Sequence, residues 1–365
     1  MNTQPKDQQV LSALRQVYSQ YGYQPYKMSK FEEYDLYVQN KDFLISDSVI
    51  TFTDTNGKLM ALKPDVTLSI IKNSKEQPGC VQKVYYTENV YRVSAAAHQY
   101  KEILQAGLEC MGDIDEVQLH EVLVLAAASL DSIHSDWVLD VSHLGVPEAL
   151  LAGLSPAVSA DLLACLGEKN PHELRRRCEA AGVATETADK LCLLISTYGH
   201  PDKVLPLLKE ALADTAAVEA IRQLETLLTP FAGTAVADRL RVDFSVVSDS
   251  RYYNGLVFKG FVNGVPDSVL SGGQYDKLMR RMGRSRGAVG FAVYLDELER
   301  LEQADPGYDV DTLLLYQPGC DLAGLKKAAD ALRQEGTVSV QQQVPAELRC
   351  RRMLRYINGE VTPCE

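Results

Sequence analysis

Residues 81–112 read VQKVYYTENVYRVSAAAHQYKEILQAGLECMG, and the other predicted elements are placed around this stretch. Two runs that are rich in β-branched and aromatic residues, 81–93 and 100–112, flank the weak loop SAAAHQ. Runs of this composition are typical of strands, and their short connection predicts that the two strands are neighbours in one sheet. We therefore expect a sheet with this pair in it.

Polar side chains alternate along the second run. Because successive strand residues point to opposite faces, Gln105 and Glu109 share one face, about 13 Å apart in an extended chain. Other polar and aromatic residues complete a candidate set: Asp65, Thr67, Arg92, Gln105, Glu109, Tyr252 and Tyr253. The set suits a zwitterion, with carboxylates for an ammonium, an arginine for a carboxylate and tyrosines for a ring. A solvated polar sheet face is the alternative interpretation.

Periodicity predicts further elements around the pair. Helices are expected over 6–21, 66–73 and 113–133, with a strand over 137–145. The alternating stretch 48–67 contains Asn56-Gly57, which predicts a two-residue hairpin turn. Pro64 is expected in the first turn of the helix that follows, where a missing N–H is tolerated.

The composition changes along the chain and suggests its organisation. Residues 146–237 are dominated by alanine and leucine with recurrent helix caps, which predicts a helical insertion. Strands resume at 240–247, 256–262, 268–273 and 288–294, helices are expected over 275–282 and 295–304, and a βαβ-like piece follows the linker Asp305-Pro306-Gly307. We therefore expect an α+β protein with an antiparallel sheet flanked by helices in 1–145 and 238–304, a helical insertion in 146–237 and a short C-terminal α/β appendix in 305–365.

Charge and cysteine usage exclude several classes of function. The net charge of −12 disfavours a polyanionic partner. The basic clusters at 175–177 and at Arg349, Arg351 and Arg352 are expected on solvated helix faces. The eight cysteines form no C-x-x-C motif, so we expect reduced thiols and no metal site. Neither a signal peptide nor an apolar stretch long enough to span a membrane is present, and we expect a soluble, cytoplasmic protein.

Motifs for nucleotides and for covalent catalysis are missing. The sequence contains no G-x-x-x-x-G-K-[ST] loop, no G-x-S-x-G elbow and no H-E-x-x-H. The glycines of GRSRGAVGFA, residues 283–292, form only a loose cluster. No catalytic residue and no cofactor are predicted.

The order of several segments resembles the catalytic core of class II histidyl-tRNA synthetases over residues 5–304. LKPDVT, 62–67, resembles the family's substrate-ammonium segment, and 84–112 is similar to its motif 2, with Arg92, Gln105 and Glu109 at matching positions. SRYYNGLVFKGF, 250–261, is similar to the histidine-specific Tyr-Tyr segment. SGGQYDKL and GAVGFAVYLDEL, within 271–298, are similar to the glycine-rich strand and motif 3.

Departures from the family pattern fall where the synthetases bind ATP. Three arginines of the family are replaced: by Ser248 in the segment before the tyrosines, by Glu297 in motif 3 and by Gln274 in the glycine strand. Motif 2 also departs from the family's Arg-x-Glu, because Ser94 stands in the place of the glutamate. The loop after Ser94, Ala95-Ala96-Ala97, lacks the further arginines of the family. A transferring phosphate needs preorganised cations, and losing one such donor typically costs about 3 kcal/mol. The resemblance therefore implies a synthetase fold without adenylation.

This combination resembles the regulatory-subunit family of short-form ATP phosphoribosyltransferase, which opens histidine biosynthesis. The resemblance implies self-dimerisation, assembly with the catalytic subunit in a hetero-octamer, and L-histidine as an effector, with no tRNA and no membrane partner. Under this hypothesis the candidate set handles histidine. The alternatives are a divergent, active amino-acid-activating enzyme of the histidyl-tRNA synthetase type and a synthetase-like amino-acid sensor with another partner.

Overall fold

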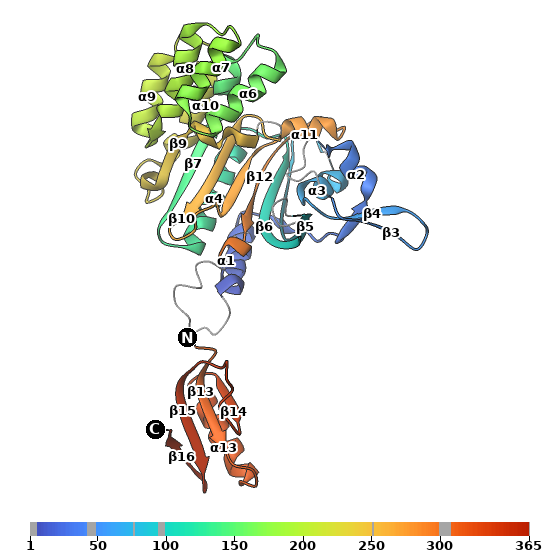
Figure 1. The fold of residues 1–365 in the computed structure, drawn as a ribbon, viewed down its shortest axis with the longest axis vertical. Helices are drawn as coiled ribbons and strands as arrows, with labels where there is room; N and C mark the ends of the chain where they lie inside the picture. Colours follow the sequence, from blue (N-terminus) through green and yellow to red (C-terminus); the bar gives the residue numbers. More distant parts are fainter. Residues whose placement is uncertain are drawn as a thin grey trace. The chain divides into compact units, whose positions relative to one another are not determined.

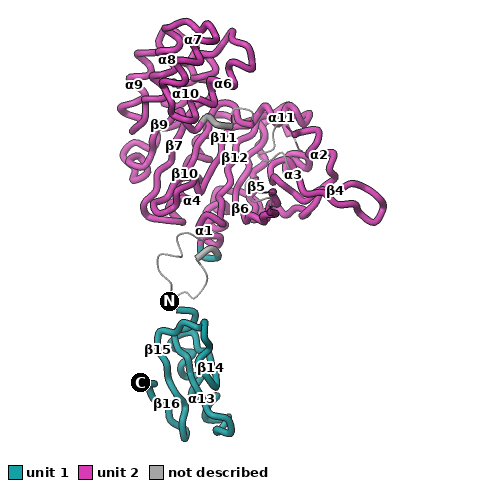
Figure 2. The backbone as a smooth tube through the Cα atoms, in the orientation of Figure 1, with its two compact units in different colours: residues 1–9, 300–365 teal, residues 10–299 magenta. Residues whose placement is uncertain are grey.

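The computed structural model describes residues 6–41, 49–75, 77–93, 99–249, 252–298 and 308–364, without the side chains of residues 6, 7 and 247–249. Contacts divide the chain into two compact units, residues 10–299 and residues 300–365 together with 1–9 (Figure 2).

A nine-stranded sheet organises the larger unit (Figure 1). Its strands, in spatial order, are β1 (Gln24–Pro25), β5 (Val81–Val93), β6 (Tyr100–Gly112), β12 (Gly287–Tyr294), β11 (Leu270–Gln274), β10 (Leu256–Val262), β7 (Trp137–His143), β9 (Leu240–Asp243) and β8 (Tyr198–Gly199). The pairs are antiparallel except β1 with β5 and β7 with β9. The predicted α+β class with an antiparallel sheet is confirmed.

The strand pair predicted first lies within this sheet. β5 and β6 pair along their whole length, from Val81 opposite Gly112 to Val93 opposite Tyr100. Their bounds match the two predicted runs. The β-branched and aromatic residues explain this length, because they pack well on a pleated surface.

One face of the sheet is apolar and is covered by α1 (Lys6–Gln20) and α4 (Glu116–Ile133) (Figure 1). Tyr18 of α1 contacts the ring of Phe291 on β12, and its hydroxyl lies 2.9 Å from Ser129 Oγ of α4. α4 begins later than predicted because Asp115 and Gln118 form a capping box, which satisfies the first backbone N–H groups.

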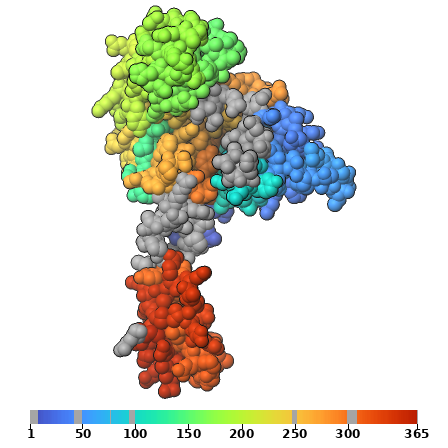
Figure 3. Space-filling view, in the orientation of Figure 1, coloured from blue at the N-terminus to red at the C-terminus, as the bar shows by residue number. Residues whose placement is uncertain are grey.

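Above the other face, near β5, lie smaller elements. They are α2 (Tyr34–Gln39), α3 (Thr67–Asn73), α11 (Asp276–Arg281) and a three-stranded sheet of β2 (Phe31–Glu33), β4 (Leu59–Leu62) and β3 (Thr51–Thr53). Tyr37, Ile70 and Leu278 form a buried core with Val84 and Tyr86 of β5. In the space-filling view, the β3–β4 hairpin projects from the body of the unit (Figure 3).

Two local predictions in this region are wrong. The last β3–β4 pair is Thr53 with Leu59, so the hairpin loop has five residues, 54–58, and not two. Asp54 Oδ1 accepts the backbone N–H groups of Asn56 and Lys58, both at 2.8 Å, and so stabilises the longer loop. Pro64 precedes the N-cap of α3 and does not lie in its first turn.

A helical segment connects β7 to β9. It comprises α5 (Gly145–Leu150), α6 (Pro156–Gly167), α7 (Pro171–Ala180), α8 (Thr185–Ser196), α9 (Pro201–Ala211), α10 (Ala217–Leu228) and the 3₁₀ turns η2 (Thr229–Phe231) and η3 (Ala237–Arg239), with β8 returning to the sheet edge. α6, α7 and α9 each begin with a proline that directly follows a capping residue. Proline is favoured at the first helical position, because the backbone N–H that it lacks would have no partner within the helix. The limits of this segment as a domain stay a prediction.

After β9 the structure departs from the predicted strand. The strand ends at Asp243, and residues Phe244–Asp249 form the 3₁₀ helix η4. Asp243 Oδ1 accepts the backbone N–H of Ser245 at 2.8 Å, which favours the turn over an extended chain. Of the helix predicted over 295–304, the described part forms only the short 3₁₀ helix η5 (Asp296–Leu298).

Within residues 308–364, the C-terminal unit forms a four-stranded sheet and the helix α13. Its elements are β13 (Val310–Tyr316), α13 (Leu322–Arg333), β14 (Val338–Gln341), β15 (Cys350–Ile357) and β16 (Glu360–Pro363), with the strand order β14-β13-β15-β16. Arg351 and Arg352 therefore lie on a strand, and their predicted placement on a helix face is wrong. The other basic cluster, 175–177, lies on α7 as predicted. Among the described residues, no helix has the length and apolarity required to cross a membrane.

Candidate functional site

A buried carboxylate on β6 lies at the centre of the predicted site. Glu109 is 2% exposed. Its Oε1 accepts a hydrogen bond from Thr67 Oγ1 at 2.7 Å, and its Oε2 accepts one from the hydroxyl of Tyr275. Thr67 opens α3 and Tyr275 precedes α11, so three elements that are distant in sequence converge on this carboxylate.

Glycines on the neighbouring strands make room for the site. Gly290 pairs with Glu109 across β12 and β6, and a Cβ at residue 290 would lie 1.9 Å from Glu109 Oε2. A Cβ at Gly273 of β11 would lie 2.9 Å from Cδ1 of Tyr253. Both separations are below any normal contact, so these positions admit only glycine while the carboxylate and the ring keep their places.

Asp65 provides a second buried carboxylate. It is 7% exposed, and its Oδ1 accepts the backbone N–H of Leu68 at 3.0 Å near the positive end of α3. Burial raises the pKa of Asp65, against the lowering effects of the Leu68 N–H and of the Arg92 cation. Arg92 Nε donates to the carbonyl of Pro64 at 3.3 Å, which holds the guanidinium beside this segment.

The paired tyrosines lie in the loop before β10, and not within a strand. The rings of Tyr252 and Tyr253 have centroids 4.8 Å apart, and the ring of Tyr252 lies 5.9 Å from that of Tyr275. Asn254 fixes the loop, because its N–H donates to Gln274 O at 2.7 Å and its Nδ2 donates to Asp276 Oδ2 at 3.1 Å. The tyrosines are therefore presented by an anchored turn.

The electrostatics of the cluster favour a proton on Glu109. Burial raises the pKa of Glu109 to about 8, the hydrogen bonds from Tyr275 and Thr67 lower it, and the nearby Asp65 raises it. Burial also raises the pKa of Tyr252 far above its usual range. A cation bound beside Glu109 would stabilise the carboxylate and lower the pKa of Glu109.

The remaining predicted residue on β6, Gln105, shares the face of Glu109 and is 4% exposed. It pairs in register with Glu88 of β5 and Tyr294 of β12. Lys63 is fully buried beside this region, and its Nζ donates to Glu88 Oε2 at 2.9 Å. That ammonium is already engaged by a carboxylate.

The positions that lack the synthetase arginines lie in different elements of the structure. Gln274 Nε2 donates to Asp276 Oδ2 at 2.8 Å, which ties the end of β11 to α11. Glu297 lies in η5, and the backbone of Ser248 lies in η4. Ser94 lies outside the described residues, as does Arg251.

Tyr275 and Tyr86 belong to the cluster but were not predicted. Tyr86 is 3% exposed on β5, and a Cβ at Gly107 would lie 2.5 Å from its hydroxyl oxygen. Tyr275 follows SGGQ of the glycine strand directly, and the sequence predicts it only as the start of the helix over 275–282. For Tyr86, the signal was the shared face with Glu88 and Arg92.

The antiparallel sheet, its two covering helices and the buried cluster around Glu109 of β6 define a class II aminoacyl-tRNA synthetase fold. The family model for histidyl-tRNA synthetase matches residues 3–298. The chain therefore belongs to the histidyl-tRNA synthetase family.

Curated relatives carry two kinds of name. An ATP phosphoribosyltransferase regulatory subunit of Oceanobacillus iheyensis is 25% identical over 325 residues, which cover 86% of this chain and 79% of the relative. A histidine–tRNA ligase of Methanocaldococcus jannaschii is 26% identical over 360 residues, which cover 96% of this chain and 85% of the relative.

Solved structures share the fold. One from Bacillus halodurans, described as an ATP phosphoribosyltransferase regulatory subunit/histidyl-tRNA synthetase, has a TM-score of 0.77 at 22% identity, covering 97% of this chain and 96% of its own. A chain of the ATP phosphoribosyl transferase (HisG:HisZ) complex from Thermotoga maritima has a TM-score of 0.62 at 17% identity, covering 78% of this chain and 96% of its own.

Proposed function

We propose that this chain is a non-catalytic regulatory subunit of the short-form ATP phosphoribosyltransferase, required for its activity and for feedback inhibition by histidine in the first step of histidine biosynthesis. The names of the curated relatives and the Thermotoga complex support this role. One observation carries the proposal: the acid and tyrosine cluster around Glu109 is kept, while four positions linked to ATP binding hold Ser94, Ser248, Gln274 and Glu297.

Loss of adenylation follows from electrostatics. Phosphoryl and adenylyl chemistry depends on preorganised cations, each worth about 10² in rate. Gln274 has no positive charge, and its amide is bound to Asp276 at 2.8 Å. Glu297 adds a carboxylate at the position where the family has a cation that meets the γ-phosphate. Three or four such losses together abolish activation of an amino acid by ATP.

The cluster is suited to L-histidine as an effector. Asp65 and Glu109 offer carboxylates for the ammonium, Arg92 offers a guanidinium for the carboxylate, and Tyr252 with Tyr253 offers rings for the imidazole. Gln105 adds a buried amide on the same face. An effector shifts a two-state assembly only by its difference in affinity for the two states, so histidine must bind the inhibited state more tightly.

The proposed partners are the catalytic subunit of the transferase and a second copy of this chain, within a hetero-octamer. Transfer RNA is not a proposed partner, because the chain carries a net charge of −12. In the C-terminal unit, several arginines are paired with acids, among them Arg349 with Asp309 and Arg352 with Glu335. A tRNA-binding surface would instead present free cations.

Reconstitution tests the proposal. A short-form ATP phosphoribosyltransferase catalytic subunit is assayed for phosphoribosyl-ATP formation alone, with this chain, and with this chain plus L-histidine. Activation that histidine reverses supports the proposal, and an unchanged rate overturns it. Tyr252→Ala should keep activation but weaken inhibition by histidine; full inhibition in that variant would remove the tyrosines from the effector site.

A second candidate is an active amino-acid-activating enzyme, because a histidine–tRNA ligase is 26% identical over 96% of the chain. ATP–pyrophosphate exchange with each amino acid distinguishes the two. Exchange above background would establish adenylation and exclude the non-catalytic role. A synthetase-like sensor with another partner predicts histidine binding without any effect on the transferase.

A further inference from the structure

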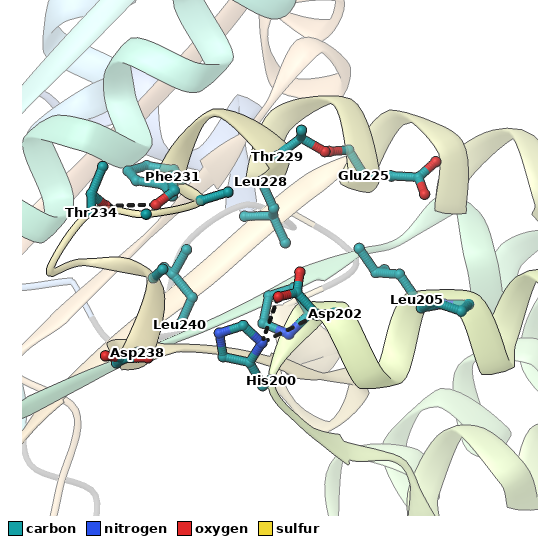
Figure 4. A pocket seen from close by; sticks show the side chains of 15 residues that line it. His200, Asp202, Leu205, Glu225, Leu228, Thr229, Phe231, Thr234, Asp238 and Leu240 are labelled. Atoms are coloured by element: carbon teal, nitrogen blue, oxygen red, sulfur yellow. Dashed lines mark hydrogen bonds and ion pairs between the residues drawn. The ribbon is translucent and has the colours of Figure 1, made fainter.

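A cavity opens in the helical segment, and none of its lining residues belongs to the cluster around Glu109. It lies between α9, α10, η2 and η3, and has a volume of about 500 Å³ (Figure 4). This volume falls within the range of sites for small molecules, about 300–1,000 Å³. The cavity is therefore large enough for a small organic ligand.

The floor of the cavity is apolar. Leu205, Leu228, Phe231 and Leu240 line it, and each is at most 4% exposed. They come from α9, α10, η2 and β9, so packing of the helical segment against the sheet edge builds the floor. Such a surface accepts the apolar body of a ligand.

The lining carries three carboxylates beside the polar side chains of His200, Thr229 and Thr234. Asp202, Glu225 and Asp238 line the cavity, and no lysine or arginine is among the described lining residues. Glu225 is neutralised by Lys209, whose Nζ lies 2.8 Å from Glu225 Oε2. Asp202 and Asp238 are thus the carboxylates available to a ligand.

His200 caps the N-terminus of α9, the helix that carries Asp202. The two side chains approach within 3.6 Å between Nδ1 and Oδ2 (Figure 4). His200 Nδ1 also accepts the backbone N–H of Asp202 at 3.3 Å, as the N-cap of α9. For Asp238, no ion pair is present within the described part of the chain. The cavity therefore has an apolar floor and a net negative lining.

We propose that this cavity binds a small organic cation, an ammonium or guanidinium carried on an apolar body. The apolar body rests on Leu228, Phe231 and Leu240, and the cation lies toward Asp202 and Asp238. Charge complementarity selects a cation over an anion, and the buried floor selects an amphipathic amine over a simple inorganic ion.

Calorimetric titration of the full chain tests this site, with 2-phenylethylamine as the probe and 2-phenylethanol as its neutral counterpart. We expect the amine to bind and the alcohol to bind about tenfold more weakly. The double variant D202N/D238N should weaken amine binding by about three- to tenfold, as expected for two largely exposed charge pairs. D189N, an exposed aspartate on α8 that is outside the cavity, is the matched control and should bind like the parent.

The cluster around Glu109 also offers acids and rings, so E109Q is titrated in parallel. Unchanged amine affinity in E109Q, with the loss in D202N/D238N, supports the cavity in the helical segment. Equal affinity for amine and alcohol, or full affinity in D202N/D238N, overturns the proposal. Binding that is lost only in E109Q assigns the amine to the cluster around Glu109 and also overturns the proposal. Binding of a lysine-containing apolar peptide without binding of the amine would make the cavity a protein-docking site instead.

Discussion

The buried carboxyl of Glu109 should make the stability of this protein fall as pH rises, and the variant E109Q should remove that dependence. The carboxyl is 2% exposed, and burial raises its pKa from 4.5 to about 8. The folded protein therefore keeps a proton that the unfolded chain releases above about pH 4.5. Raising the pH favours the form that has lost the proton, which is the unfolded chain.

The magnitude follows from linkage. One proton held only by the folded state lowers the free energy of unfolding by about 1.4 kcal/mol for each pH unit between the two pKa values. The stabilisation is complete below pH 4.5, and it is lost as the pH rises through about 8. The total is about 5 kcal/mol, a large part of the stability of a typical protein.

Urea unfolding of the parent and of E109Q at pH 5.5, 6.5 and 7.5 measures this term. The difference between their free energies of unfolding should change by about 1.4 kcal/mol per pH unit, because every other titrating group is common to both proteins. E102Q, on an exposed glutamate of the same strand, is the matched control. Parallel pH profiles for parent and E109Q would refute a protonated Glu109 in the folded state.

Three further predictions concern the same architecture. G290A should destabilise the protein by about 1–3 kcal/mol in urea unfolding, because its Cβ would lie 1.9 Å from Glu109 Oε2; stability equal to the parent would contradict the packing. If histidine binds as proposed, its ammonium should release a proton from Glu109 near pH 7, seen by calorimetry in buffers of different ionisation enthalpy; buffer-independent heats would argue against contact with this carboxyl. Q223L should cost about 1–3 kcal/mol, because Gln223 Oε1 accepts from the buried His143 Nε2 at 2.7 Å; a loss below 0.5 kcal/mol would show that this donor finds water.

Much of the framework was predictable because it rests on local regularities. The two thirteen-residue strands at 81–93 and 100–112 follow from a period of two and β-forming residues, and their bounds were predicted correctly. The shared face of Gln105 and Glu109 follows from the same alternation. Helix α4 was predicted within three residues, because its capping residues and apolar period are written in the chain.

Long-range packing determines the features of the site and of the fold that no local pattern predicts. Tyr275 reaches Glu109 across 166 positions of sequence, and no local pattern carries that contact. The strand predicted over 240–247 became η4 after Asp243, whose side chain bonds the turn. Burial on all sides, which only the folded chain creates, moves the pKa of Glu109 to about 8. The chain alone indicates which residues are polar on a strand face, whereas desolvation and convergence of α3, β6 and the segment before α11 decide their chemistry.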